Sequence, residues 1–322
     1  MDIKPDHKLF WFNYKLNDKL INVEYIENRD VLDRLKNEIS LFYDLKKKDN
    51  PWNNIVDRTF PFSLVTSDYT KFKRVFKINR AYHKLKEILH EFNFNNIRDA
   101  LCLCEAPGGF VQALKLHNKN TKWTAVSLPN SIKFSSIIER EYHGTVIYRD
   151  IIRDKVTFDG KFDFITADGG FDTSSQYIQQ EDMSSKLISS EIELAYKYLK
   201  EGGHFIIKMF DIYNSESQDS IVKLYKNFKS VHICKPPCSK PSNSEKYIVC
   251  KYYVPNGIDR TKKEIDQVIS LIHDVISYSS MIQEQFIRKG LSQLWEPNKK
   301  DTECYYNQQL KYKILYERIY KQ

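Results

Sequence analysis

The chain has 322 residues, of which 41% are hydrophobic and 29% charged, so it can bury a sizeable core and is neither a disordered nor a fibrous protein. The formal net charge of +8 permits a polyanionic partner such as nucleic acid. The mean hydropathy is −0.55 and no run approaches ~18 consecutive apolar residues, which argues against a membrane protein.

The first 75 residues contain one clear helical pattern. Apolar residues recur at helical spacing over residues 30–45, which predicts a helix there. Around it, Pro51, Trp52 and residues 60–62 are interpreted as loop that packs on another part of the chain. Residues 78–92 predict a second amphipathic helix, and Lys84 lies beside its apolar stripe.

Residues 71–86 carry seven bases and no acid. Aromatic residues, Phe72, Phe76 and Tyr82, interleave these bases, as is typical of a surface that binds nucleic acid, although a solvated helix face gives the same charge pattern. The bases that we expect to contact RNA are Lys71, Lys73, Arg74, Lys77 and Arg80.

After residue 96 short apolar strands alternate with helices. Strands are predicted at residues 100–104, 123–128, 144–148, 162–167 and 203–209, and helices at residues 109–116 and 186–199. Crossovers of this length imply a parallel sheet with helices on both faces. A closing antiparallel pair at the sheet edge is predicted at residues 230–234 and 246–253, followed by helices at residues 262–278, 281–294 and 310–320.

The turn after the first of these strands has the position of a nucleotide-binding loop, because it joins a strand to a helix. Two adjacent glycines let a ligand approach the backbone, whereas Pro107 removes a donor and no lysine follows to hold phosphates. The turn therefore favours a nucleoside-type ligand without phosphate, such as S-adenosyl-L-methionine, over an ordinary tight turn. The loop residues are Glu105, Ala106, Pro107, Gly108, Gly109 and Phe110.

Three charged residues stand at strand ends or within a strand. Asp168 follows a central strand, where open α/β sheets bind ligands. Lys208 interrupts an apolar strand, which is costly unless the side chain reaches a cleft or a carboxylate. Glu245 enters the last strand and alone would be interpreted as a surface residue.

Taken in order, five motifs resemble the FtsJ-like ribose 2′-O-methyltransferases, most closely the mRNA cap branch of eukaryotes and large DNA viruses. They are NRAYHKL, LCEAPGGF, DFITADGG, GGHFIIKMF and KPPCSKPSNSEKYIVCK, within about residues 77–253. The resemblance implies an α/β, Rossmann-like methyltransferase fold with a mostly parallel sheet, an antiparallel last strand and helical extensions at both ends. It also implies the cofactor S-adenosyl-L-methionine and a catalytic tetrad of Lys84, Asp168, Lys208 and Glu245.

By this resemblance Lys208 is the central residue for the ribose hydroxyl. As a base it needs a lowered pKa, which burial and Lys84 favour while Asp168 and Glu245 act in the opposite direction. Alternatively, Lys208 stays charged and contributes orientation and electrostatic stabilisation.

Two further cofactor contacts are expected. Ser127 stands where such folds usually have an acid for the ribose hydroxyls, and Asp150 resembles the acid that contacts the adenine amine, with Asp154 as its rival.

The resemblance divides the chain into residues 1–75, an extension for cap or RNA binding, the methyltransferase core at residues 76–254, and a helical extension at residues 255–322. A cap needs aromatic faces beside a carboxylate. We favour the amino-terminal candidates over those around Trp295, Tyr305 and Tyr306. The amino-terminal candidates are Trp11, Trp52, Phe60, Phe62 and Tyr69, near Asp57 and Asp68.

The expected reaction is therefore methylation of the 2′-hydroxyl on the first transcribed nucleotide of capped mRNA. The rivals are a methyltransferase of ribosomal or transfer RNA and a catalytically silent RNA-binding subunit. Capped mRNA is the expected partner, and a partner in the capping or transcription machinery stays open. No membrane partner is expected, as the hydropathy indicates. No metal site is expected either, since the cysteines lack the usual zinc-ligand spacing. Cysteine usage and the absence of a signal sequence favour the cytoplasm, or a virion for a viral protein, with the nucleus as the alternative.

Overall fold

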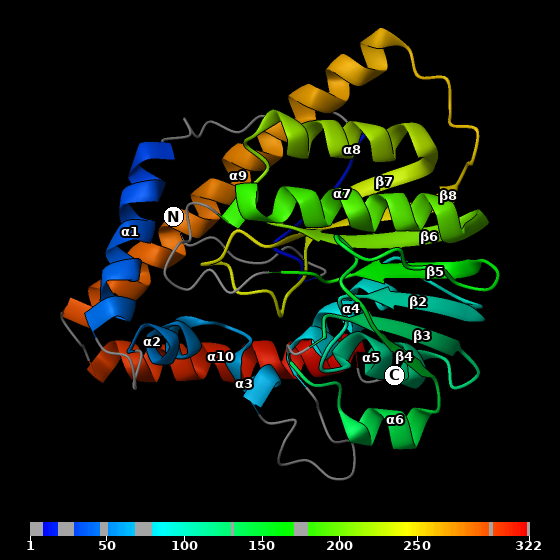
Figure 1. Cartoon of the computed structure of the whole chain (residues 1–322). Helices are drawn as coiled ribbons and strands as arrows, with labels where there is room; N and C mark the ends of the chain where they lie inside the picture. Colours follow the sequence, from blue (N-terminus) through cyan, green and yellow to red (C-terminus); the bar gives the residue numbers. More distant parts are fainter. Residues whose placement is uncertain are drawn as a thin grey trace.

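The structure is a computed structural model that describes residues 9–18, 29–45, 51–67, 79–129, 132–170, 180–295 and 299–320. Within this part of the chain, eight strands form one sheet in the order β1-β7-β8-β6-β5-β2-β3-β4 (Figure 1). The strands are β1 Phe12–Lys15, β2 Asp99–Leu103, β3 Lys122–Ser127, β4 Thr145–Tyr148, β5 Phe162–Ala167, β6 Leu199–Met209, β7 Phe228–Lys235 and β8 Lys246–Tyr253.

The strand directions confirm a mostly parallel sheet with an antiparallel last strand. Strands β4, β3, β2, β5 and β6 pair in parallel, and β8 pairs antiparallel with both β6 and β7. The closing pair is not at the edge, however, because β1 pairs with β7 through Phe12 opposite Lys235. The four residues of β1 are too few to show an alternating pattern, yet they cover an edge that would otherwise expose unpaired backbone groups.

Helices cover both faces of the sheet, and others form the extensions. They are α1 Arg29–Leu45, α2 Pro51–Thr59, α3 Ser63–Ser67, α4 Ala81–Glu91, α5 Gly109–His117, α6 Ser136–Tyr142, α7 Gln180–Tyr198, α8 Ser215–Asn227, α9 Lys262–Trp295 and α10 Lys299–Tyr320. Helices α4 and α5 pack on one face of the sheet, and α7 and α8 on the other (Figure 1). The segment expected to be loop around Trp52 is helical in α2, and the two helices expected between residues 262 and 294 form the single helix α9.

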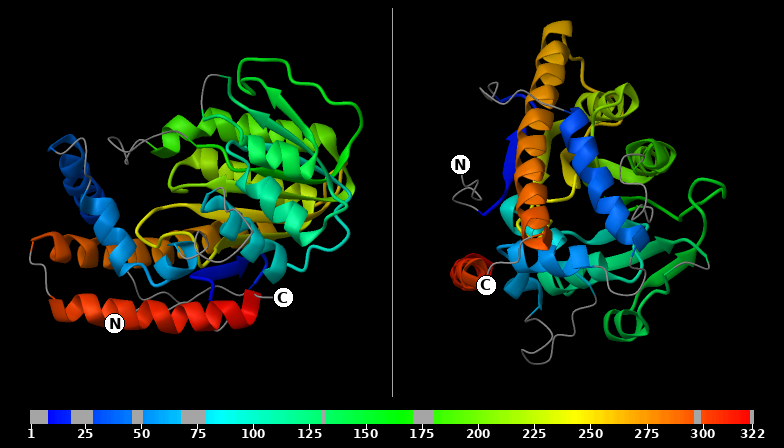
Figure 2. Two further views of the ribbon diagram at one scale, coloured as in Figure 1. Left: turned by 90° about the horizontal axis from the view of Figure 1, so that it is seen from below. Right: turned by 90° about the vertical axis from the view of Figure 1, so that its left-hand side faces the viewer.

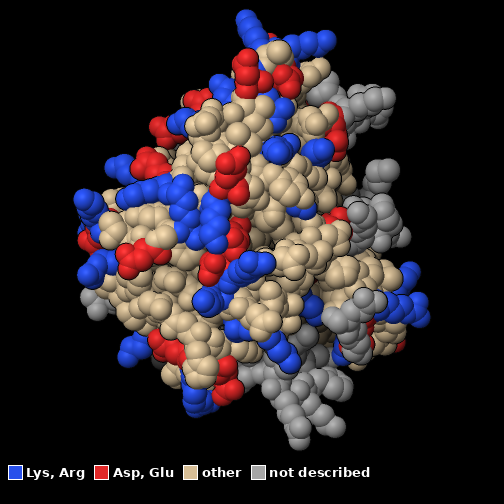
Figure 3. All heavy atoms as spheres, turned by 90° about the vertical axis from the view of Figure 1, so that its right-hand side faces the viewer, with Lys and Arg blue, Asp and Glu red and all other residues tan. Residues whose placement is uncertain are grey.

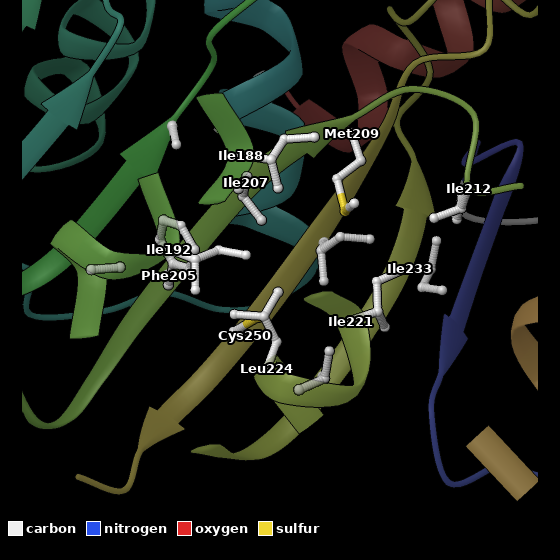
Figure 4. Packing of buried hydrophobic residues seen from close by; sticks show 14 of the residues in the cluster. Ile188, Ile192, Phe205, Ile207, Met209, Ile212, Ile221, Leu224, Ile233 and Cys250 are labelled. Atoms are coloured by element: carbon white, nitrogen blue, oxygen red, sulfur yellow. The ribbon is translucent and has the colours of Figure 1, made fainter. Parts of the chain in front are cut away.

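The core on the α7–α8 face fixes the direction of the β6 side chains (Figure 4). Phe205, Ile207 and Met209 of β6 are buried there with apolar residues of α7 and α8. Because side chains alternate along a strand, Ile206 and Lys208 lie on the opposite face, which α4 covers. The pattern of β6 thus places Lys208 on the same side as the helix that carries Lys84.

The two extensions pack on each other as well as on the sheet (Figure 2). Helix α9 contacts α1 and α2, and α10 contacts α2 and α3. A separate apolar cluster joins α1, α2 and α9 and contains Leu32, Leu35, Ile39, Trp52, Val56, Ile287 and Leu291. Among the described helices, none combines the length and the apolar character that crossing a membrane requires.

Candidate active site

The loop after β2, Asp168 after β5 and Lys208 near the end of β6 meet at one edge of the sheet. These are the carboxyl ends of neighbouring parallel strands. The chain runs from β2 outward to β4 and then returns to place β5 on the other side of β2. Ligands of open α/β sheets bind at such a switch point. Glu245 reaches the same edge because β8 runs antiparallel and begins there.

Lys208 and Asp168 form the first ion pair of this site. The Lys208 Nζ lies 3.2 Å from Asp168 Oδ1 and donates a hydrogen bond of 2.9 Å to the Asp168 backbone oxygen. The Tyr247 hydroxyl donates to the same carboxylate oxygen at 2.9 Å. Tyr247 stands opposite Lys208 in the β6–β8 register, so one cross-strand pair holds Asp168 from two directions.

Lys84 and Glu245 form the second ion pair. The Lys84 Nζ lies 2.7 Å from Glu245 Oε1, and the Ser239 hydroxyl donates to that oxygen at 2.7 Å. The Lys235 Nζ donates to the backbone oxygen of Glu245 at 2.6 Å. The structure therefore brings the four predicted tetrad residues into two adjacent pairs, each with a hydroxyl donor that the sequence did not reveal.

The charges of the two pairs are coupled. Burial alone would lower the pKa of Lys208, but Asp168 and Glu245, with Glu191, outweigh burial and raise it above the usual lysine value. Burial likewise would raise the pKa of Glu245, but Lys84, Lys208 and Lys235 outweigh it and lower that pKa to about 2. In this structure Lys208 is therefore a cation and Glu245 an anion at neutral pH, which favours the electrostatic role of Lys208 over that of a base.

The loop predicted to bind the cofactor has a rigid support. The Glu105 carboxylate accepts the backbone N–H groups of Phe110 at 2.7 Å and Val111 at 3.0 Å, at the start of α5. Burial raises the pKa of Glu105 to about 8. Glu105 therefore fastens the loop to the start of α5, and the N–H groups of Ala106 and Gly108 are also hydrogen bonded within the protein.

Two positions in this loop require glycine. Gly108 has φ of +114°, a conformation that L side chains rarely adopt. A Cβ on Gly109 would lie 2.0 Å from the Asn79 side-chain oxygen, so α5 can approach the start of α4 only with glycine there. Both glycines therefore serve the packing of the loop, and its contact with a ligand stays a prediction.

Ser127 and Asp150 bind neighbouring backbone in the structure. The Ser127 hydroxyl accepts the Ala106 N–H at 3.1 Å, so its local role is to hold the cofactor loop. Asp150 accepts the N–H groups of Ile152 at 2.9 Å and Arg153 at 3.3 Å. Asp154 accepts the N–H of Asp150 at 2.8 Å. Their contacts with a cofactor remain predictions.

Sequence reasoning missed Glu191, a buried carboxylate of α7 behind the site. Its side chain is hydrogen bonded to Cys104 and to the backbone of Gly169, and burial raises its pKa to about 8. A Cβ on Gly169 would lie 2.4 Å from Glu191 Oε1, so the turn after Asp168 rests directly on this carboxylate. One signal was available in the sequence, because Glu191 falls on the buried α7 stripe of Leu187 and Ala195.

The residues predicted to contact RNA are described only in part. Lys71, Lys73, Arg74 and Lys77 lie outside the described residues. Arg80 is exposed and lies 3.6 Å from Asp57. On the face drawn in Figure 3, basic and acidic side chains of the described residues are interspersed, without a continuous basic surface.

The aromatic residues favoured for cap binding are mostly core residues. Trp11, Phe60 and Phe62 are at most 1% exposed, and Trp11 packs edge-on against Phe62 and Phe286. The expectation that these three offer open faces to a cap is wrong, because they join the amino-terminal segment to the core. Tyr69, Asp68 and the Trp295 side chain lie outside the described residues, whereas Tyr306 is 55% exposed.

A cavity of about 230 Å³ has Phe210 in its lining, and the Lys208 Nζ lies 5.4 Å from the centroid of the Phe210 ring. The extensions contribute Lys36, Trp52 and Gln283 to its lining, and the core contributes Phe210, Lys240 and Ser244. Phe210 follows Lys208 closely in the chain, and Ser244 precedes Glu245. A substrate that reaches the ion pairs from this side would contact both the core and the extensions.

Comparison with known proteins finds methyltransferases. Residues 77–253 match the model of the FtsJ-like methyltransferase family. The chain is 29% identical over 226 residues to cap-specific mRNA (nucleoside-2′-O-)-methyltransferase 2 of Drosophila melanogaster, which covers 58% of this chain and 32% of the relative. It is 29% identical over 268 residues to cap-specific mRNA (nucleoside-2′-O-)-methyltransferase 1 of Ailuropoda melanoleuca, which covers 69% of this chain and 32% of the relative.

A viral relative is matched over more of its own length. The cap-specific mRNA (nucleoside-2′-O-)-methyltransferase of Autographa californica nuclear polyhedrosis virus is 26% identical over 214 residues, which are 61% of this chain and 82% of the relative. By contrast, the chain spans about a third of the length of the two animal relatives.

Proposed function

The chain belongs to the FtsJ-like methyltransferase family, and from this premise we propose that it methylates the 2′-hydroxyl of the first transcribed nucleotide of capped mRNA. The observation that carries the proposal is the convergence of Lys84, Asp168, Lys208 and Glu245 in two ion pairs beside the loop after β2. The names of the eukaryotic and viral relatives support capped mRNA as the substrate.

S-adenosyl-L-methionine, the methyl donor of this family, supplies an electrophilic methyl group on a sulfonium. The loop from Glu105 to Phe110 suits such a donor because it joins β2 to α5 at the carboxyl end of the sheet and no lysine follows it to hold phosphates. Ser127 and Asp150, which flank the ends of β3 and β4, are the residues that would approach its ribose and adenine.

The two ion pairs would act on the acceptor hydroxyl. Its oxygen must be held in line with the methyl group. The hydroxyl proton would pass to water as the new bond forms, because Lys208 already carries its own proton. The Lys208 ammonium would orient this oxygen and stabilise the negative charge that develops on it, while Asp168 and Tyr247 fix the ammonium position. The Lys84–Glu245 pair would hold the other side of the ribose.

Capped RNA would reach the ion pairs past the cavity lined by Lys36, Phe210 and Lys240. The basic segment before α4, with Lys73 and Arg74, would neutralise its phosphates. In this proposal residues 1–75 and 255–322 supply contacts with RNA around the core at residues 76–254. The proposed location is the cytoplasm, or the virion for a viral protein, with the nucleus as the alternative.

The test compares two transcripts of identical sequence, one capped and one with a 5′ triphosphate. Each is incubated with labelled S-adenosyl-L-methionine and the wild-type protein, with Lys208→Ala as the control. We expect label to enter the capped transcript with wild type only. Equal labelling of both transcripts would contradict cap dependence, and labelling by the control would contradict the site.

A further inference from the structure

We propose that His83, Glu87 and Cys238 bind one divalent metal ion with the ligand preference of zinc, behind the Lys84–Glu245 pair. Their candidate ligand atoms all lie within 4.8 Å of one another. The three residues are 0%, 0% and 1% exposed. This proposal does not depend on the proposed activity, because it concerns only what the cluster binds.

Two distant segments supply the ligands. His83 and Glu87 are four residues apart on α4, so their side chains lie on one helix face. Cys238 lies in the segment between β7 and β8, and its backbone N–H donates to Glu87 Oε2 at 3.0 Å. The fold therefore already fixes the position of Cys238 against the helix that carries the other two ligands.

The donor set matches the chemistry of zinc. Imidazole nitrogen, carboxylate oxygen and thiolate sulfur bind this ion at about 2.0 to 2.3 Å, so ligand atoms around it are roughly 3.5 Å apart. Small rotamer changes would bring the present spacing to that value. One carboxylate and one thiolate also neutralise the two charges of the ion, so the filled site would bury no net charge.

A residue of the carboxyl-terminal extension closes the cluster. The Tyr316 hydroxyl of α10 lies 3.4 Å from His83 Nδ1, and Tyr316 is buried. A hydrogen bond to Nδ1 is the contact that orients a histidine ring so that Nε2 faces a metal. Helix α10 would thus seal the site and support its histidine ligand.

The ion would brace the candidate active site from behind. Lys84 follows His83 in α4, and Ser239, which donates to Glu245 at 2.7 Å, follows Cys238. Both segments that hold the Lys84–Glu245 pair would then be fastened to one ion. Cysteine spacing did not predict this site, because its one cysteine is more than 150 residues from the other two ligands.

The test uses the full chain, purified under reducing conditions, supplied with zinc and then desalted. We expect about one zinc per chain by elemental mass spectrometry in wild type and in Cys304→Ser, which changes an exposed cysteine. We expect loss of this zinc in Cys238→Ser. Replacement by cobalt should give wild type and Cys304→Ser a thiolate-to-cobalt charge-transfer absorption.

One outcome would overturn the proposed metal site. If folded wild type holds no more zinc than Cys238→Ser and shows no such absorption with cobalt, the cluster is only a hydrogen-bonded network and the proposal fails. Circular dichroism reports whether Cys238→Ser folds. If it does not fold, zinc content and cobalt absorption of the wild type and of Cys304→Ser decide the question.

Discussion

At the scale of single residues, the charged neighbours of Lys208 determine what it can do. Its ammonium is held between the Asp168 carboxylate and backbone, and nearby carboxylates keep its pKa above the usual lysine value against the effect of burial. Such a group is suited to stabilise negative charge on an oxygen, and it is not suited to remove a proton in the absence of bound substrates.

We therefore predict that Lys208→Ala lowers the rate of methyl transfer by about 100-fold or more, because a fixed charge at the reacting oxygen is lost. Affinity for S-adenosyl-L-methionine should stay nearly unchanged, since Lys208 serves the hydroxyl. Single-turnover kinetics and calorimetric titration of the cofactor measure the two quantities. An equal loss of both would show that Lys208 holds the cofactor instead.

Glu191 gives a prediction about pH and stability. Its pKa is raised by burial to about 8 in the folded protein, against about 4.5 when unfolded. The folded state therefore binds more protons between these values, and Glu191 costs stability as pH rises from about 4.5 to about 8. Replacing Glu191 with Gln keeps the shape of the side chain and removes its ionisable group.

The melting temperature of Glu191→Gln should therefore rise relative to wild type between pH 5 and pH 8. We expect a gain on the order of 1 to 2 kcal/mol, which is a few °C for a chain of this size. Thermal melts at a series of pH values measure the difference. A difference between variant and wild type that does not change with pH would contradict the buried neutral carboxyl.

At the scale of elements, a buried ion pair fastens α1 to the end of β6. The Lys36 Nζ lies 2.9 Å from Asp211 Oδ2, and both side chains are buried. Burial would raise the pKa of Asp211, but Lys36 and Lys246 outweigh it and hold that pKa low. Asp211 is three residues beyond Lys208, so the amino-terminal extension supports the catalytic strand directly.

Lys36→Met should cost about 3 kcal/mol of unfolding free energy, because it leaves a buried carboxylate with one cation fewer. Arg34→Met is the matched control, since Arg34 is exposed on the same helix and donates only to a backbone oxygen. Urea denaturation of both variants provides the comparison. Similar midpoints for the two would mean that α1 is not fastened through this pair.

Elements with strong apolar periodicity could be predicted from the sequence, and short or polar ones could not. Strand β5 was predicted with its observed bounds because its apolar run is bordered by turn residues. Helix α8 was missed, although Asn214 caps it by accepting the Ser217 N–H. Its buried residues Ile221, Leu224 and Tyr225 stand at helical spacing, so the sequence did carry a signal for α8, which was overlooked.

The same limit applies to the candidate site. The tetrad residues were identified through the resemblance of five motifs to a known family, whereas Tyr247 and Ser239 were not identified. Tyr247 matters because the β6–β8 register puts it opposite Lys208, and Ser239 because its loop folds back onto Glu245. These contacts depend on strand pairing between distant segments, which one sequence does not specify.

At the scale of the whole molecule, the extensions pack on each other and on the methyltransferase core through buried apolar residues. Apolar residues of α1, α2 and α9 form one cluster, and Trp11 and Phe62 pack with the core of the sheet. The extensions are thus packed both on each other and on the core, and the division at residues 75 and 254 stays a prediction. It remains a proposal about which segments supply RNA contacts.

Binding of RNA by the whole chain should depend strongly on salt, because phosphate neutralisation releases counterions. Reversing Lys73 and Arg74 to Glu should weaken binding at low salt. It should also reduce the slope of log affinity against log salt by about 1.4 or more, from about 0.7 for each phosphate contact with a single strand. Fluorescence anisotropy between ~50 and 200 mM salt measures both effects. Affinity that is unchanged by salt would exclude the basic segment as an RNA contact.

The central claim, transfer to the ribose hydroxyl of the first transcribed nucleotide, is tested most directly by removing that hydroxyl. Two capped RNAs that differ only in a 2′-deoxy substitution at the first nucleotide are incubated with the protein and labelled S-adenosyl-L-methionine, and the nucleosides are then analysed. The account predicts 2′-O-methylated first nucleotide from the ribose substrate and only background label from the deoxy substrate. Undiminished transfer to the deoxy substrate would contradict it.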